Sequence, residues 1–398
     1  MSQNLKARLK LINKTRGTEK KSQSAVKKEV VFDKNLWLDW EEVAPDVLKK
    51  DIELKLPPFN KVFPNTLSIL IPDFLEAFLD KKGRLPLIEK ILFFDLETTG
   101  LSGGAGTIAF LAAFGRFTEQ GSLKITQYLL LDYPGECDFI EAVVNEIKHP
   151  VLVTYNGKSF DTQILLNRCL MNRIKAPSYY HGDLLHPARR LWKNILPSCS
   201  QAVIETSILD LDRTDDVSGA MAPEIWFSFL RSKDNTELLK ICTHNEKDIF
   251  GLATMFITMT KIADNPYTNK ISYDEEALAL YWESTIRKNP LLFSPEEKSI
   301  GEKLLIDAAN KGGKKASYRL SFIYFRNGMD TEARKLLQSI KNDFRALKAL
   351  AIDAEWRLCD IKLTLKYVNK ALSLSEISEK EKEDMEKRQM RLEGKKEG

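Results

Sequence analysis

The sequence predicts an α/β domain built on a mixed β-sheet, followed by an all-α domain. An unbroken apolar run at residues 91–94 leads directly into acidic residues, as expected for a buried strand that ends at a polar site. Further strand-like runs alternate with segments of helical apolar spacing up to about residue 260. From about residue 271 the apolar spacing is helical throughout. These three observations place the sheet in the first two thirds of the chain.

Size and composition are those of an ordinary globular protein. The 398 residues suffice for two or three domains, and 43% of them are hydrophobic and 29% charged. No apolar run is long enough to cross a bilayer, and no secretory signal is present, so we expect a cytoplasmic protein with no membrane partner. The five cysteines are scattered without a CxxC pair, which argues against a disulfide framework or a zinc site.

Two segments precede the predicted sheet. Residues 1–30 carry nine Lys or Arg against two Glu, which is typical of a disordered tail or of a basic arm that contacts phosphates. Residues 31–88 are rich in aromatic residues and prolines. The aromatic residues predict a lead-in packed on the next domain, and the prolines argue against long regular elements.

The first strand of the sheet is predicted within ILFFDLETTG, residues 91–100. Asp95 and Glu97 lie two residues apart and therefore share one face of the strand. The two like charges repel each other, and burial strengthens the repulsion. A Mg²⁺ or Mn²⁺ ion between them would stabilise the arrangement. The alternative is a pair of solvated carboxylates at an ordinary strand end.

The elements that follow alternate between strand and helix. Residues 101–106 form a Gly-rich turn, which is not a phosphate loop because no GxxxxGK[ST] is present and a strand follows. Two strands with a short, antiparallel connection are predicted at 107–117 and 123–131. A short strand is predicted at 151–154, and helices at 137–148, 159–173, 183–192, 200–211 and 237–260.

Two more carboxylates and a histidine lie on these elements. Asp161 falls in the first turn of a helix that leaves a strand, where the helix dipole also favours an acid. His244 and Asp248 are four residues apart and share a helix face. The acids at positions 95, 97, 161 and 248 suffice to hold two divalent ions about 4 Å apart, which is the general apparatus of phosphodiester hydrolysis. The acids between 210 and 216 are mostly explained by turn chemistry.

The C-terminal part contains a weak helical repeat. A helix pair begins near residue 316, and a similar pair begins about 30 residues later. This pattern is typical of tetratricopeptide-like hairpins, and a plain helical bundle is the alternative. Residues 376–398 alternate acids and bases, as in a solvated helix or tail.

Three motifs resemble a known family. DLETTG, YNGKSFD and HNEKD resemble, in this order, the motifs of the DnaQ-like, four-acid (DEDD) 3′–5′ exonucleases, which share the ribonuclease H-like fold. The likeness is closer to the YprB-type branch, which adds a DLLH-AR-LW segment (183–192) and a DD-SG-P stretch (215–223). Some members of that branch carry tetratricopeptide-like helices. The resemblance covers about residues 89–260 and implies three antiparallel strands plus parallel strands.

The resemblance also implies roles for the acids and the histidine. Asp95 would bridge two metal ions, Glu97 would bind one and position the nucleophile, and Asp161 and Asp248 would complete the ligands. His244 is the candidate general base, since histidine titrates near neutral pH. It lies four residues before the last Asp, whereas DnaQ-type enzymes place this histidine five before it.

Substrate contacts are expected close to these residues. Thr98 belongs to the first motif, and Asn156 and Lys158 belong to the second. Asn156 and Lys158 either contact a substrate phosphate or shape the loop. Asp183 recurs in the resembled branch as a structural residue.

The expected function is a Mg²⁺- or Mn²⁺-dependent nuclease, a 3′–5′ exonuclease acting on single-stranded DNA or RNA. One alternative is a scaffold that recruits a protein partner through its helical repeats. Another is a structure-specific endonuclease, because fold does not fix function. The expected organisation is a basic tail (1–30), a lead-in (31–88), a ribonuclease H-like domain (89–263) and a helical domain (271–398).

Overall fold

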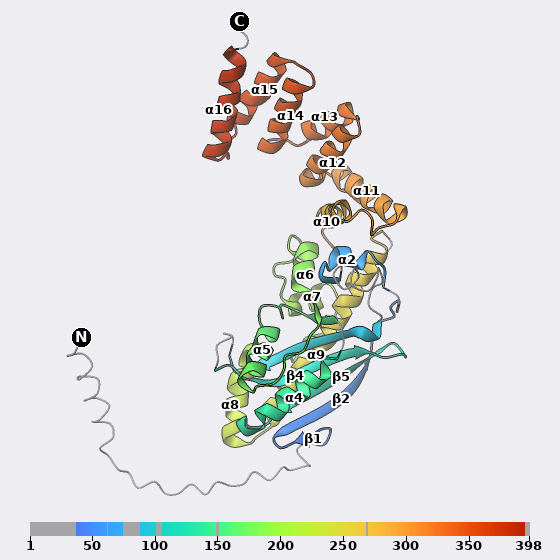
Figure 1. The fold of residues 1–398 in the computed structure, drawn as a ribbon, viewed down its shortest axis with the longest axis vertical. Helices are drawn as coiled ribbons and strands as arrows, with labels where there is room; N and C mark the ends of the chain where they lie inside the picture. The colour runs from blue at the N-terminus through green and yellow to red at the C-terminus, as the bar shows by residue number, and fades with distance from the viewer. Residues whose placement is uncertain are drawn as a thin grey trace, which may run out of the picture. The chain divides into compact units, whose positions relative to one another are not determined.

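The structure is a computed structural model, and it describes residues 37–61, 63–74, 88–100, 106–148, 151–267 and 270–394. The predicted basic tail at 1–30 and residues 101–105 of the Gly-rich turn lie outside these residues. From residue 40 onward the described chain belongs to one compact unit. Figure 1 shows the order of its helices and strands.

A seven-stranded mixed sheet lies at the centre of the α/β part, in the order β1-β2-β5-β4-β3-β6-β7. Neighbouring strands from β1 to β3 pair antiparallel, whereas β3–β6 and β6–β7 pair parallel. The strands are β1 (Glu41–Ala44), β2 (Val47–Lys55), β3 (Ile91–Thr98), β4 (Ala109–Phe117), β5 (Ser122–Leu130), β6 (Val151–Thr154) and β7 (Tyr180–Asp183). The mixed sheet expected from the sequence is confirmed.

Strands β1 and β2 correct one expectation. The prolines of residues 31–88 argue against long regular elements, but β2 has nine residues and pairs with β5 along its whole length. Pro45 lies in the turn between β1 and β2, and Pro57 and Pro58 follow β2. None of these prolines removes a ladder hydrogen bond, so this part of the segment extends the sheet. Further along the segment, Phe63 and Phe74 pack against Phe256, with ring centroids 5.3 and 5.7 Å apart.

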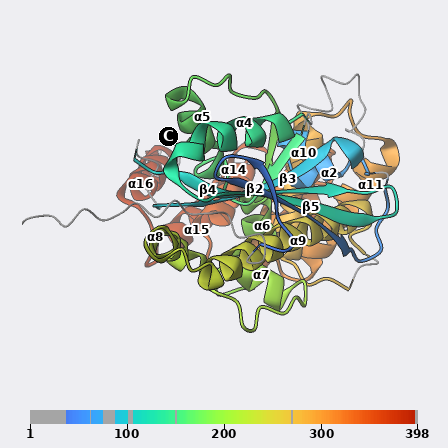
Figure 2. The ribbon, with the colours of Figure 1, turned by 90° about the horizontal axis from the view of Figure 1, so that it is seen from below.

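Helices cover both faces of the sheet. Figure 2 shows α4 and α5 on one side and α7, α8 and α9 on the other. The helices of this part are α2 (Leu67–Leu70), α4 (Glu136–Glu146), α5 (Asp161–Met171), α6 (Leu185–Trp192), α7 (Gln201–Ser207), α8 (Ala222–Ser232) and α9 (Thr236–Asp264), with 3₁₀ turns at Ile88–Lys90, Tyr133–Gly135 and Gly219–Met221. The long helix α9 packs along β3, β4 and β5.

The register of β3 determines which side chains face α9. Phe93 is fully buried, and its ring contacts Phe256 of α9 with ring centroids 5.7 Å apart. Because alternate residues of a strand share a face, Asp95 and Glu97 point to the same side as Phe93. The two acids of the first motif therefore face α9, which carries His244 and Asp248.

The remainder of the described chain is helical, as the sequence predicts. It comprises α10 (Glu275–Lys288), α11 (Pro295–Asn310), α12 (Lys314–Arg326), α13 (Asp330–Ser339), α14 (Phe344–Trp356), α15 (Ile361–Leu372) and α16 (Glu379–Gly394). Leu278, Trp282 and Leu305 join the same hydrophobic core as the sheet, whereas α13–α16 pack around two smaller clusters. Within the described residues, no helix combines the length and apolarity needed to span a membrane.

Candidate metal centre

The four acids predicted as metal ligands gather where β3 meets α9 and the start of α5. Asp95 and Glu97 lie on β3, Asp161 is the first residue of α5, and Asp248 lies within α9. The carboxylate of Asp95 experiences the charges of Asp161, Asp248 and Glu97. Glu97 in turn experiences those of Asp248 and Asp161. Residues that are far apart in the sequence thus form one acidic cluster.

Burial and mutual repulsion change the proton affinity of this cluster. Burial, followed by repulsion from the neighbouring acids, raises the pKa values of Asp95 and Glu97 well above their ordinary range. Burial likewise raises the pKa of Asp161 to about 7, although the backbone amide of Leu96 partly offsets the effect. Burial and mutual repulsion therefore favour the protonated forms of these three carboxyl groups, and a bound cation would favour their ionised forms.

Three side chains of the cluster have the spacing of a metal site. One potential ligand atom each from Glu97, His244 and Asp248 lies within 4.8 Å of the other two. His244 Nε2 is 3.3 Å from Asp248 Oδ2, as expected for residues four apart on a helix. The side chains of His244 and Asp248 are 15% and 21% exposed, so solvent and ions reach them.

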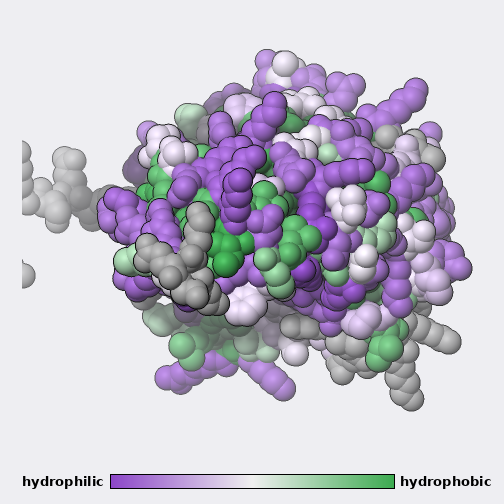
Figure 3. Space-filling view, turned by 90° about the horizontal axis from the view of Figure 1, so that it is seen from above, coloured by the Kyte–Doolittle hydropathy of each residue, from purple (hydrophilic) through white to green (hydrophobic). Residues whose placement is uncertain are grey.

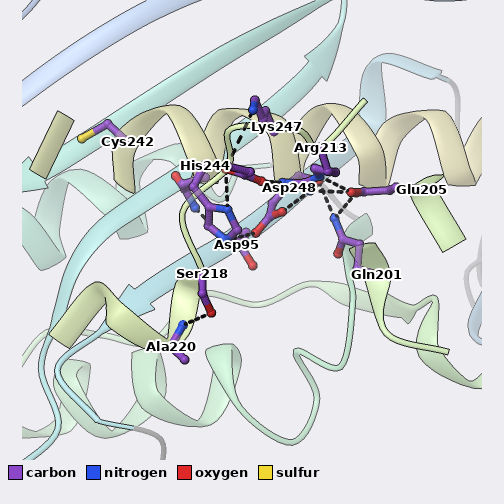
Figure 4. Close-up of polar contacts among 12 residues, drawn as sticks. Asp95, Gln201, Glu205, Arg213, Ser218, Ala220, Cys242, His244, Lys247 and Asp248 are labelled. Carbon is purple, nitrogen blue, oxygen red and sulfur yellow. Dashed lines mark hydrogen bonds and ion pairs between the residues drawn. The ribbon is translucent and has the colours of Figure 1, made fainter. Parts of the chain in front are cut away.

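A loop after α7 adds an arginine and a further acid to the cluster (Figure 4). Arg213 donates hydrogen bonds to Glu205 and Asp216, each at 2.5 Å, and to Asp248. Asp216 Oδ1 lies 3.0 Å from His244 Nδ1. Burial opposes the charge of Asp216, but the hydrogen bonds from Arg213 and His244 keep its pKa below the ordinary value. One guanidinium therefore contacts three carboxylates, two of which, those of Asp216 and Asp248, also contact the histidine.

Asp216 is an exception among the acids of this loop. Asp212 accepts hydrogen bonds from the backbone N–H and the hydroxyl of Thr214, both at 2.7 Å, as turn chemistry predicts. Asp210 and Asp215 adopt positive φ angles of 54° and 61°, which are also typical of turns. Only Asp216 of these four contacts the histidine. The sequence alone does not separate it from its neighbours.

Asn245 is a second residue that the sequence analysis does not identify. Its side-chain amide donates to Asp95 Oδ2 at 2.7 Å and accepts from Gln127 Nε2 at 3.0 Å. Gln127 also donates to the carbonyl of Cys242 at 2.9 Å. Asn245 and Gln127 are fully buried, so the orientation of Asp95 is fixed from the neighbouring strand and helix. The sequence feature that could have identified Asn245 is its position inside the HNEKD motif, between His244 and Asp248.

Helix α7 supports Asp248 and Arg213 through Gln201 and Glu205. Gln201 Nε2 donates to the backbone carbonyl of Asp248 at 2.7 Å and to Glu205 Oε1 at 2.8 Å. Glu205 is fully buried, and burial raises its pKa even though Arg213 lowers it. A Cβ atom placed on Gly251 would lie 1.6 Å from Glu205 Oε1. The glycine in α9 is therefore what lets Glu205 approach the helix.

Asp183 shapes the loop that leads to Asp161. Its carboxylate accepts hydrogen bonds from the backbone N–H groups of Asn156 at 2.8 Å, Lys158 at 3.1 Å and Leu185 at 3.0 Å. The side chain is buried at the end of β7. This arrangement agrees with the structural role expected of Asp183.

The three predicted substrate-binding residues make contacts within the protein. The Thr98 hydroxyl donates to the carbonyl of Gly100 at 2.9 Å. Asn156 adopts a positive φ of 64°, and the amine of Lys158 pairs with Asp73. Asn156 and Lys158 thus contribute to the form of the loop, and their contact with substrate stays a prediction.

Comparison with known proteins supports the resemblance seen in the motifs. A family model described as RNase H superfamily matches residues 92–260. The uncharacterized protein YprB of Bacillus subtilis (strain 168) is 37% identical over 174 residues, which cover 43% of this chain and 42% of the relative. This chain therefore spans less than half the length of that relative. The predicted likeness to the YprB-type branch is confirmed over this region.

Among solved structures, the family B DNA polymerase from the hyperthermophilic archaeon Pyrobaculum calidifontis is similar to 51% of this chain and 30% of its own. The TM-score is 0.33 and the sequence identity is 13%. A similarity this low has no bearing on function.

Proposed function

We propose that this chain is a divalent-metal-dependent nuclease, because residues 92–260 match a family model described as RNase H superfamily. The reaction is hydrolysis of phosphodiester bonds in single-stranded nucleic acid, by removal of nucleotides from the 3′ end. The single observation that carries the proposal is the acidic cluster of Asp95, Glu97, Asp161 and Asp248, together with His244.

The donor set of the cluster fits Mg²⁺ or Mn²⁺. Carboxylate oxygens are the ligands that these hard cations prefer. The raised pKa values of Asp95, Glu97 and Asp161 are what buried acids show when no cation balances their charge. Two such ions, when bound, would supply Lewis-acid activation of water and charge neutralisation at the scissile phosphate.

The residues of the chain have separate tasks in this proposal. Asp95, Glu97, Asp161 and Asp248 hold the cations, and Asn245 keeps the Asp95 carboxylate in place. Both ring nitrogens of His244 face a carboxylate, Nδ1 that of Asp216 at 3.0 Å and Nε2 that of Asp248 at 3.3 Å. The shorter contact favours the tautomer in which Nδ1 carries the proton, and cations on Asp248 would favour it further. Nε2 of His244 is then the atom that accepts a proton from the attacking water.

The test uses oligonucleotides of single-stranded DNA and RNA labelled at the 5′ end, at the 3′ end or internally. With Mn²⁺ or Mg²⁺ we expect the 5′-labelled strand to shorten stepwise and the 3′-labelled strand to release mononucleotide at once. EDTA should abolish both signals. Asp95→Asn should reduce cleavage to background, and Asp215→Asn, which alters an exposed acid of the same loop as Asp216, should cleave like the wild type.

Each contrary outcome identifies another function. Internal fragments at early times, with both ends retained, would assign endonuclease action. Absence of cleavage with either metal, on every strand type, would favour a scaffold that uses the nuclease fold without its chemistry. If Asp95→Asn cleaves as fast as the wild type, the acidic cluster is not the catalytic site.

A further inference from the structure

A groove lies in the C-terminal helices, outside the RNase H superfamily domain. It has a volume of about 750 Å³ and is lined mainly by α12 and α14, with Glu381 of α16 at its edge. Figure 3 looks onto the end of the molecule that carries α14–α16, where hydrophobic side chains gather among hydrophilic ones. The proposed nuclease function assigns no role to this groove.

Aromatic rings line the groove and remain accessible. Trp356, the last residue of α14, is 68% exposed, and Phe322 of α12 is 41% exposed. The rings of Tyr318 and Phe322 lie 4.9 Å apart between centroids. Side chains of this size are normally buried, so accessible faces on two adjacent helices indicate a surface that stacks against a flat partner.

Cationic side chains alternate with these rings. Arg326, Arg345, Lys348 and Arg357 line the groove, against the acids Asp353 and Glu381. The guanidinium of Arg345 lies 5.7 Å from the ring centroid of Tyr318, and that of Arg357 lies 4.2 Å from that of Phe325. The groove is therefore both aromatic and positively charged.

The two acids reduce this charge only in part. Asp353 is 4% exposed and receives a hydrogen bond of 2.6 Å from Arg334, which lies outside the groove. Glu381 caps the start of α16 by accepting from the backbone and hydroxyl of Ser378.

Three of the groove cations have acidic neighbours: Arg345 pairs with Asp343 at 3.6 Å, Lys348 with Asp384 at 2.6 Å and Arg357 with Asp353 at 3.5 Å. These three side chains are 60%, 38% and 45% exposed, and ion pairs at such exposure are weak, so a phosphate can compete for them. Arg326 forms no ion pair among the described residues, so it is the cation most available to an anionic occupant.

We propose that this groove binds single-stranded nucleic acid. Bases offer flat faces that stack on Trp356, Phe322 and Tyr318, and phosphates offer the charge that the arginines and Lys348 match. An acidic peptide would satisfy the cations but would leave the exposed rings without a planar partner. This proposal rests on the proposed nuclease function. The groove would be a second binding site for the strand whose 3′ end is cleaved at the acidic cluster.

The test measures binding of fluorescent oligo(dT) and oligo(U) to the full chain by anisotropy, in EDTA so that no strand is cut. Trp356→Ala should weaken binding at least about fivefold, because it removes one stacking contact. Arg326→Ala should weaken binding and reduce the slope of log affinity against log salt by about 0.7. Trp356→Phe, which keeps a ring, should retain most of the affinity.

Two controls separate the groove from general effects. Met390→Ala removes an exposed apolar side chain of α16 outside the groove, so it should bind like the wild type. The assay measures binding alone and contains EDTA, so a failure of the nuclease proposal would not affect how this result is interpreted. Wild-type binding by Trp356→Ala and Arg326→Ala, or preferential binding of oligoglutamate, would overturn the assignment.

Discussion

The raised pKa of the Asp161 carboxyl group should make the free energy of unfolding depend on pH. Burial raises its pKa from 3.8 to about 7 in the folded protein. Between these two pH values the folded state binds a proton that the unfolded state has lost, so stability falls as pH rises. Asp161→Asn should therefore raise the free energy of unfolding in EDTA by about 1 to 3 kcal/mol at pH 8.

The gain should be smaller at pH 5, where the native carboxyl group is already protonated. Urea denaturation of the two proteins at both pH values measures the difference. An equal effect at pH 5 and pH 8 would show that the ionisation of Asp161 is not the cause.

Bound metal ions should offset the charge repulsion among the acids of the cluster. We expect Mn²⁺ to raise the melting temperature of the wild type, and to raise it more at pH 8 than at pH 6, since protons compete with the cation for Asp95, Glu97 and Asp161. Thermal unfolding with and without Mn²⁺ measures the shift. Asp95→Asn should show a reduced shift, and an undiminished one would place the ion elsewhere.

Asn245 should matter for catalysis without touching substrate. Asn245→Ala removes the 2.7 Å hydrogen bond to Asp95. Loss of a hydrogen bond that orients a metal ligand typically costs about 10- to 100-fold in activity or metal affinity. Titration with Mn²⁺ in the cleavage assay should show a higher half-saturating concentration, and an unchanged value would mean that Asp95 holds its position unaided.

Local spacing predicted some of these residues and not others. Asp95 and Glu97 follow from strand alternation, and His244 and Asp248 follow from the helical repeat. Asn245 contacts an acid 150 positions away, and Arg213 contacts one 35 positions away. No local pattern contains such pairs, because tertiary packing alone brings them together.

At the scale of one element, the packing of helix α9 against Glu205 depends on a single glycine, Gly251. Intrinsic propensity would favour Gly251→Ala by about 1 kcal/mol in a helix. Here the added methyl group would overlap Glu205, so we expect a net loss of about 1 to 3 kcal/mol and displacement of the carboxylate that holds Arg213. Gly394→Ala in α16, where a Cβ meets no atom within 4 Å, serves as the control in the same denaturation assay.

The strands show where sequence patterns succeed and fail for whole elements. β3 was predictable because its first four residues are apolar and fully buried. β2 contains many charged residues and has prolines on both sides, so the composition of this segment does not predict a strand. β7 has only four residues, YHGD, and its strand form depends on the ladder with β6. Short or half-exposed strands depend on partners that composition does not reveal.

At the scale of the whole molecule, the sheet and the first C-terminal helices share one core. Trp282 and Leu278 of α10 belong to the same buried cluster as Phe93. Trp192 of α6 donates a 2.9 Å hydrogen bond to the carbonyl of Ser272, just before α10. The helices next to the sheet are therefore part of its folding unit.

Truncation tests this continuity. A chain that ends after Asp264 loses the partners of α2 and α6, and we expect it to be poorly soluble and to melt well below the full chain. A chain that ends after Arg326 keeps α10–α12 and should melt near the full-length value. Similar behaviour of the two shortened chains would contradict a shared core.

The carboxylate of Asp183 changes how a mutational scan of this protein should be interpreted. It accepts hydrogen bonds from two backbone amides of the segment that presents Asp161 and from a third at the start of α6. Asp183→Ala should therefore abolish the proposed cleavage as completely as the loss of a metal ligand. A screen that reads activity alone would count it among the chelating acids. Thermal unfolding of each inactive variant in EDTA would separate the two groups, since a ligand variant keeps its folded structure without the ion whereas a variant with a displaced loop is destabilised.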